Sequence, residues 1–275
     1  MKEIYQFLNR LHLDLLLIYE TYVEKSKLLK WYYNMGVEEI LSNVPRKSSD
    51  KPFSPPTKDI KKDIVENKPN LVLGSREIID QARKLADSCS NLEELKEIVM
   101  NFDQCNLKKT ATNTVFSDGN PSAKIMLIGE APGANEDLTG IPFCGDSGKL
   151  LDACLASIGY DRTNLYITNS IFWRPPGNRR PTPDEIAICL PFVEKHIALI
   201  KPELLILVGS TAVSAVMNLN EPMSKIRQRF FQYRNQYLES DMNVCAIFHP
   251  SYLLRQPSQK KQMWHDLLLI KEFLG

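Results

Sequence analysis

Four short apolar segments, each followed by a helical pattern, constrain the fold of this 275-residue chain most strongly. Continuous apolar runs bounded by turn residues are typical of buried strands. Strands that alternate with helices favour a parallel sheet covered by helices on both faces. The sequence therefore predicts an α/β fold, a three-layer αβα arrangement around a central, mostly parallel four-stranded sheet, with strands at 124–128, 165–168, 203–208 and 244–248.

The chain before this alternation is organised differently. Residues 1–43 carry apolar side chains at spacings of three and four, which predicts an N-terminal helical extension. A packed helical hairpin explains this pattern more simply than a partner-binding or membrane-surface helix. Residues 44–72 are rich in Pro, Ser and Lys, which indicates a flexible linker, so the α/β domain is predicted to span 73–275. Within it, Ser90 and Glu93 predict a capping box at the start of a helix.

Charge and cysteine content exclude several classes of protein. The formal net charge is +1, so any nucleic-acid contact must come from local patches. No stretch of 18 apolar residues lacks a charge, which argues against a membrane span. Glu3 and Asp14 around the first apolar segment argue against a signal peptide. The six cysteines have no CxxC spacing and are expected to be reduced, in a cytoplasmic protein without membrane contact.

Three of the four predicted strands end in residues capable of chemistry. Glu130 follows the first strand within the segment GEAPG, Asn169 ends the second, and His249 follows the fourth. Parallel strands place their carboxyl ends at one edge of the sheet, so these side chains should converge. Each also has an ordinary interpretation: a salt bridge for Glu130, a turn cap for Asn169, a satisfied edge histidine for His249. Their joint placement favours a site.

Several named motifs are excluded. GDSGKL resembles a phosphate-binding loop, but Phe143 stands where that motif needs Gly, and Leu150 where it needs Ser or Thr. No GxGxxG segment follows a strand, and no GxSxG segment is present, which disfavours dinucleotide enzymes and α/β-hydrolases. The four histidines have no metal-binding spacing.

Two basic segments favour DNA as the ligand. WRPPGNRRPTP contains no acidic residue, and its prolines stiffen a loop whose guanidinium groups suit bidentate phosphate contacts: Arg174, Arg179 and Arg180. HPSYLLR offers the Ser251 hydroxyl for a phosphate, Leu253 as an apolar wedge and Arg255 as a cation. Ordinary surface loops are the alternative, but a wedge beside cations is explained more economically by DNA.

These motifs together resemble the uracil-DNA glycosylase superfamily. The similar segments are GEAPGANEDLTGIPFCGDSGKLLD, YITNSIFWRPPGNRRPTPDEI and FHPSYLLR, in the order that the superfamily has them. The similarity is greatest to the family 4 type of bacteria and archaea and covers about residues 102–273. Residues 1–100 lie outside the part that the resemblance covers.

The resemblance implies that uracil is flipped out of the DNA stack into a pocket. Phe143 matches the aromatic residue that stacks on the base, and Asn169 the amide that reads the uracil edge. Glu136 matches the residue that blocks the thymine methyl group. His249 matches the donor to uracil O2, and Glu130 belongs to the water-binding motif. The rest of the first loop would contribute to the same substrate site, with Gly129, Ala131, Pro132 and Gly133.

The resemblance also implies that Ser251 contacts a phosphate and that Leu253 displaces the flipped base from the stack. The implied function is that of a monofunctional, metal-independent uracil-DNA glycosylase of base excision repair, acting as a monomer. The alternative is a catalytically weak protein that binds or tethers DNA lesions, with residues 1–72 recruiting an unknown protein partner. The presence of both Glu130 and His249 favours the enzyme.

Family 4 proteins typically hold a [4Fe–4S] cluster through four cysteine thiolates. In this chain Phe102 and Trp173 stand at two of the ligand positions, and only Cys105 and Cys189 remain. Aromatic side chains cannot ligate iron. The resemblance therefore implies no cluster, with Phe102 and Trp173 packed in its place and the two cysteines as reduced thiols.

Overall fold

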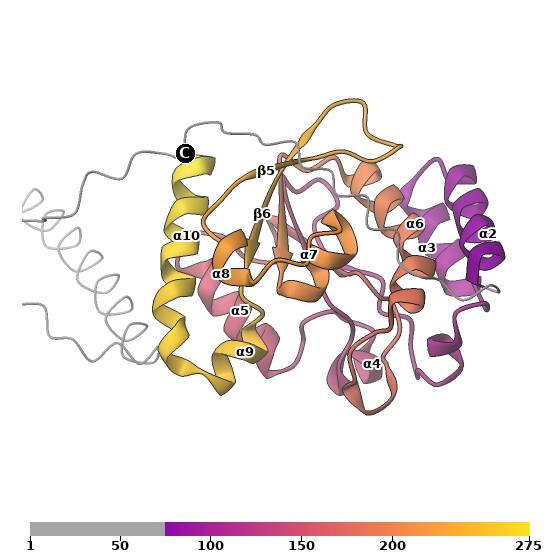
Figure 1. Cartoon of the computed structure of the whole chain (residues 1–275), viewed down its shortest axis with the longest axis horizontal. Coiled ribbons are helices and arrows are strands. Elements are labelled where there is room, and N and C mark those ends of the chain that lie inside the picture. The colour runs from indigo at the N-terminus through magenta and orange to yellow at the C-terminus, as the bar shows by residue number, and fades with distance from the viewer. Residues whose placement is uncertain (1–74) are drawn as a thin grey trace, which may run out of the picture. The chain divides into compact units, whose positions relative to one another are not determined.

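The computed structural model describes residues 75–275. The predicted helical extension over 1–43, the predicted linker over 44–72 and the predicted start of the domain at 73 lie outside the described residues. Figure 1 shows the three layers, with α2, α3 and α6 on one side of the sheet and α5 and α10 on the other. The predicted three-layer α/β fold is confirmed.

Within residues 75–275 the sheet has six strands in the order β1-β3-β2-β4-β6-β5. The four central strands are parallel, as predicted, and two short antiparallel strands flank them. Every residue of β2, β3 and β4 is buried, which explains why their sequences are continuous apolar runs. The strands are β1 (Asp118–Gly119), β2 (Ile125–Gly129), β3 (Leu165–Asn169), β4 (Leu204–Val208), β5 (Phe231–Tyr233) and β6 (Met242–Ile247).

The helices fill the connections between these strands. The α-helices are α2 (Ser75–Ser88), α3 (Leu92–Asn101), α4 (Ala134–Thr139), α5 (Asp146–Ala156), α6 (Pro183–Ile200), α7 (Ser210–Met217), α8 (Met223–Ile226), α9 (Pro250–Arg255) and α10 (Lys260–Leu274). Short 3₁₀ turns are η1 (Asn106–Lys109), η2 (Pro176–Asn178) and η3 (Pro257–Gln259). No described helix is long and apolar enough to cross a membrane.

The predicted capping box at Ser90 and Glu93 is wrong by one residue. Asn91 is the N-cap of α3, and its side-chain oxygen accepts a hydrogen bond from the backbone N–H of Glu94 at 2.9 Å. The Glu94 carboxylate accepts from the backbone N–H of Ser90 at 2.7 Å. Asn is as good an N-cap as Ser. The Glu94 carboxylate binds the N–H of the residue before the cap, whereas in a capping box it would bind the N–H of the cap itself.

A fully buried histidine lies in α6, on the side of the sheet away from α10. The His196 ring stacks on Phe116 with centroids 4.5 Å apart, and its Nε2 shares a hydrogen bond with the Tyr166 hydroxyl at 2.8 Å. Its Nδ1 has no hydrogen-bond partner among the described residues. Burial lowers the pKa of His196 to about 3, so the folded protein holds this imidazole neutral.

We expect the free energy of unfolding to fall as the pH is lowered from 6.5 toward 3. The His196 imidazole binds a proton in the unfolded chain but stays neutral in the folded protein. The free energy of unfolding therefore falls by about 1.4 kcal/mol per pH unit in that window. Urea unfolding across the window should therefore show a shallower decline for His196→Leu than for the wild type. Equal slopes would contradict this assignment.

Candidate active site

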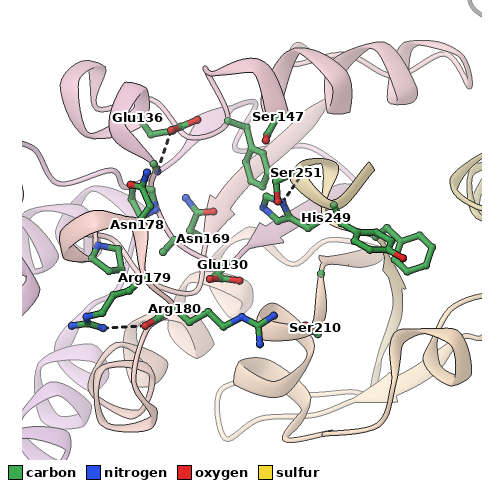
Figure 2. A pocket seen from close by; sticks show the side chains of 18 of the residues that line it. Glu130, Glu136, Ser147, Asn169, Asn178, Arg179, Arg180, Ser210, His249 and Ser251 are labelled. Carbon is green, nitrogen blue, oxygen red and sulfur yellow. Dashed lines mark hydrogen bonds between the residues drawn. The ribbon is translucent and has the colours of Figure 1, made fainter. Parts of the chain in front are cut away.

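A pocket of about 700 Å³ opens at the carboxyl ends of the parallel strands. The loops after β2, β3, β4 and β6 all contribute to it, as expected where the strands of an open α/β sheet end. Figure 2 shows Glu130, Asn169 and His249 pointing into one space from the ends of β2, β3 and β6. The lining residues are Glu130, Ala131, Pro132, Gly133, Glu136, Phe143, Ser147, Asn169, Pro175, Asn178, Arg179, Arg180, Gly209, Ser210, Met223, Phe248, His249, Ser251, Tyr252 and Arg255.

Gly129 brings an amide and an aromatic ring together at the end of β2. It pairs with Asn169 across the two central strands. A Cβ atom on Gly129 would lie 2.3 Å from Asn169 Oδ1 and 2.4 Å from Phe143 Cζ. Asn169 is only 2% exposed, so its amide is held between neighbouring groups. A residue with a side chain at Gly129 would displace both groups.

Phe143 has a left-handed backbone conformation with φ of 53°. This conformation is unfavourable for a bulky residue, so the surroundings must hold it. Arg162 donates to the carbonyl oxygens of Pro142 and Phe143, and it is itself held by ion pairs with Asp118 and Asp152. The aromatic ring is thereby fixed in the pocket wall, 5.8 Å from the ring centroid of His249.

The hydrogen bonds of His249 define its tautomer. Its Nδ1 accepts from the backbone N–H of Ser251 at 3.2 Å and lies 2.8 Å from the Ser251 hydroxyl oxygen. The proton of the neutral ring is therefore on Nε2. Burial is the largest influence and lowers the pKa of His249; Glu130 opposes this and Arg255 reinforces it. The site holds a neutral imidazole with an N–H donor.

Glu136 binds two loops through its carboxylate. One oxygen accepts from the backbone N–H of Gly133 and the other from that of Gly145, each at 3.1 Å. Glu136 is the third residue of α4, a short helix that the sequence did not predict because glycine and proline surround it. The carboxylate lines the pocket while it ties the loop after β2 to the start of α5.

The four predicted phosphate-binding arginines have different environments. Arg179 is paired with Glu185 at 2.7 Å, and Arg174 lies outside the pocket lining, where its Nε donates to Asn178 at 2.7 Å. Arg180 and Arg255 line the pocket, and neither forms an ion pair within the described part of the chain.

Leu253 is buried, so its predicted role as a wedge is wrong. Its side chain is 0% exposed, whereas that of Leu254 is 46% exposed. Leu253 lies one helical turn after the buried Pro250 in α9, so these two residues share the inner face. Leu254 lies one turn after Ser251, which lines the pocket.

Several lining residues were not predicted. Ser210 follows β4, so the reasoning from strand ends that selected Glu130, Asn169 and His249 would also have found it. Gly209 and Phe248 carry the same signal, since they directly follow β4 and β6. Loop packing places the remaining ones, which have no such signal: Ser147, Pro175, Asn178, Met223 and Tyr252.

The four positions that match the cluster ligands come together away from the pocket. Phe102 and Trp173 are buried and stacked with centroids 6.5 Å apart. Cys105 and Cys189 are buried and share a hydrogen bond, which together with burial raises the pKa of the Cys189 thiol. Over residues 75–275 no three His, Cys, Asp or Glu side chains are grouped so that they could hold a metal. These residues do not fit a cluster held by four thiolates.

Comparisons with known proteins agree with this geometry. The chain matches the sequence model of the uracil DNA glycosylase superfamily over residues 116–268. It is 38% identical over 190 residues to the type-4 uracil-DNA glycosylase of Saccharolobus solfataricus, covering 67% of this chain and 87% of that protein. It is 35% identical over 189 residues to the type-4 uracil-DNA glycosylase of Archaeoglobus fulgidus, covering 67% of this chain and 94% of that protein.

Proposed function

The chain belongs to the uracil-DNA glycosylase superfamily, and we propose that it hydrolyses the N-glycosidic bond of flipped-out deoxyuridine in DNA, leaving an abasic site for base excision repair. The observation that carries the proposal is the convergence of Glu130, Asn169 and His249 in one pocket at the strand ends. The proposed cytoplasmic location, the monomeric state and a protein partner for residues 1–72 rest on the sequence alone.

Base recognition is assigned to Asn169 and Phe143. A fixed amide accepts from uracil N3–H and donates to O4, whereas cytosine reverses that pattern at one edge. The Phe143 ring stacks on the base, and Glu136 blocks the position of the thymine methyl group. Both oxygens of Glu136 accept backbone hydrogen bonds, which supports a rigid block.

Bond cleavage is assigned to His249 and Glu130. As the C1′–N1 bond breaks, its electron pair passes to the uracil, and the Nε2–H of His249 donates to O2 where charge develops. A water oxygen bonds to C1′, and its proton passes to Glu130 and from there to solvent, which protonates the released uracil anion. The carboxylate also stabilises the positive charge that develops on the sugar.

DNA engagement is assigned to Arg180 and Arg255, with Leu254 in place of Leu253 as the wedge. We expect Leu254→Ala to slow excision from a duplex more than from a single strand, because only the duplex stack must be opened. Single-turnover rates on matched single-stranded and U·G substrates measure this.

Leu253→Ala is the matched control for the wedge. Removing this buried side chain should lower the free energy of unfolding by about 2–5 kcal/mol without a preference between the two substrates. Equal slowing of both substrates by Leu254→Ala would refute the assignment.

We also propose that the protein works without an iron–sulfur cluster. The stacked Phe102 and Trp173 occupy two ligand positions, and the free thiols of Cys105 and Cys189 share a hydrogen bond. Protein purified without oxygen is expected to be colourless and free of stoichiometric iron. A brown preparation with about four irons per chain would contradict this.

A lesion-binding protein without catalysis is the second candidate on the same fold. Incubation with a single-stranded oligonucleotide that carries one deoxyuridine, and with its U·G duplex, separates the two. The proposal expects alkali-labile sites in both and none where thymine or cytosine replaces uracil. Tight binding without such sites would favour the second candidate.

A further inference from the structure

The pocket is larger than one flipped base requires. Its volume of about 700 Å³ is several times that of a pyrimidine ring. The groups assigned to uracil come from the loops after β2 and β3 and from His249. A further part of the lining comes from the start of α7, from α8 and from the β6–α9 junction, through Ser210, Met223, Phe248 and Tyr252.

Two aromatic rings dominate this second part. Phe248 directly follows β6, and Tyr252 lies four residues later in α9. Their centroids are 5.0 Å apart, and both side chains are half-buried while they line the pocket. Aromatic rings that line a pocket can stack on a planar group that enters it.

A buried ion pair holds the Phe248 ring in place. The Arg227 guanidinium lies 4.0 Å from the ring centroid. Arg227 is 7% exposed and donates two hydrogen bonds to the Asp266 carboxylate, at 2.6 and 2.7 Å. The ring is thus fixed before any ligand arrives, which reduces the entropy lost on binding.

Positive charge accompanies the aromatic pair. Figure 2 shows the Arg180 side chain extending past Glu130 toward Ser210. Arg255 lines the same pocket, and neither arginine forms an ion pair within residues 75–275. Rigid aromatic rings beside unpaired cations are the combination with which proteins bind single-stranded nucleic acid, the rings stacking on bases and the cations following phosphates.

We propose that Phe248 and Tyr252 form a stacking site for the nucleobase next to the flipped uracil in single-stranded DNA. The inference rests on the proposed function, because it places a second nucleotide of the same strand in the same pocket. If so, the protein binds two bases of one strand. An oligonucleotide in which the base next to the uracil is missing should therefore bind more weakly than one with both bases.

The test couples a change in the protein to a change in the DNA. Single-stranded oligonucleotides carry 2′-fluoro-deoxyuridine, whose fluorine slows cleavage by destabilising the cationic sugar. They have either normal neighbours or an abasic spacer on one side. The wild type is expected to lose about tenfold in affinity when the stacked neighbour is removed, as for other base–aromatic contacts.

Tyr252→Ala is expected to bind the normal and spacer oligonucleotides equally, while Tyr252→Phe retains the wild-type difference. Tyr160→Ala, outside the pocket lining, is the control and should also retain it. Equal binding of both oligonucleotides by the wild type, or an unchanged difference in Tyr252→Ala, would overturn the stacking site. Uracil release from natural deoxyuridine is measured in parallel, and its absence would refute the proposed function separately, since the binding comparison needs no cleavage.

Discussion

His249→Ala is expected to lower the single-turnover rate of uracil excision by roughly 10²–10³-fold while the affinity for DNA changes little. The hydrogen bond from Nε2 strengthens only as charge builds on uracil O2, so its loss affects the transition state more than the bound substrate. The Ser251 N–H that Nδ1 accepts fixes this proton on Nε2. Rapid-quench kinetics with enzyme in excess, beside a binding titration, measure both quantities.

His265→Ala is the matched control, because His265 is an exposed histidine of α10 that does not line the pocket. It should leave both the rate and the affinity unchanged. If His249→Ala bound DNA more weakly but retained normal chemistry, the role assigned to His249 would be wrong.

Asn169→Ala is expected to weaken transition-state stabilisation for uracil excision by on the order of 2–4 kcal/mol, because a buried polar contact to the base is lost. Asn169→Asp should also slow uracil excision strongly and relax the exclusion of cytosine, since a carboxylate cannot donate to O4. Single-turnover excision from uracil- and cytosine-containing strands measures both effects.

Asn243→Ala controls for the loss of an amide elsewhere in the domain. Asn243 lies in β6 and bonds to Gln232, away from the pocket lining. It should leave excision intact. Unchanged excision by Asn169→Ala would remove Asn169 from base recognition.

The central sheet could be predicted because strands that are buried on both faces have continuous apolar sequences. β2, β3 and β4 are buried at every residue and mostly apolar. In the helices between them, apolar residues recur every three or four positions. The edge strand β1 spans two residues, too few for a pattern to show. The helix α4 was missed because glycine and proline surround its six residues.

The site was predictable where topology alone places a residue. Glu130, Asn169 and His249 follow strands, so their convergence needed only the parallel sheet. Leu253 and Leu254 could not be told apart, since they are adjacent leucines and the packing of α9 decides which one is buried. Phe248 directly follows β6, so the same reasoning could have selected it. The packing of its ring against Arg227, which is paired with Asp266, could not be predicted, because both residues are distant in the sequence.

The most direct test of a glycosylase site at these strand ends is a product balance on one oligonucleotide with a single deoxyuridine. Mass spectrometry measures free uracil, and electrophoresis measures the strand before and after alkali. We expect one uracil released per abasic site formed, with the strand intact until alkali is added. Absence of free uracil, or strand breaks before alkali, would contradict hydrolysis of the N-glycosidic bond by Glu130, Asn169 and His249.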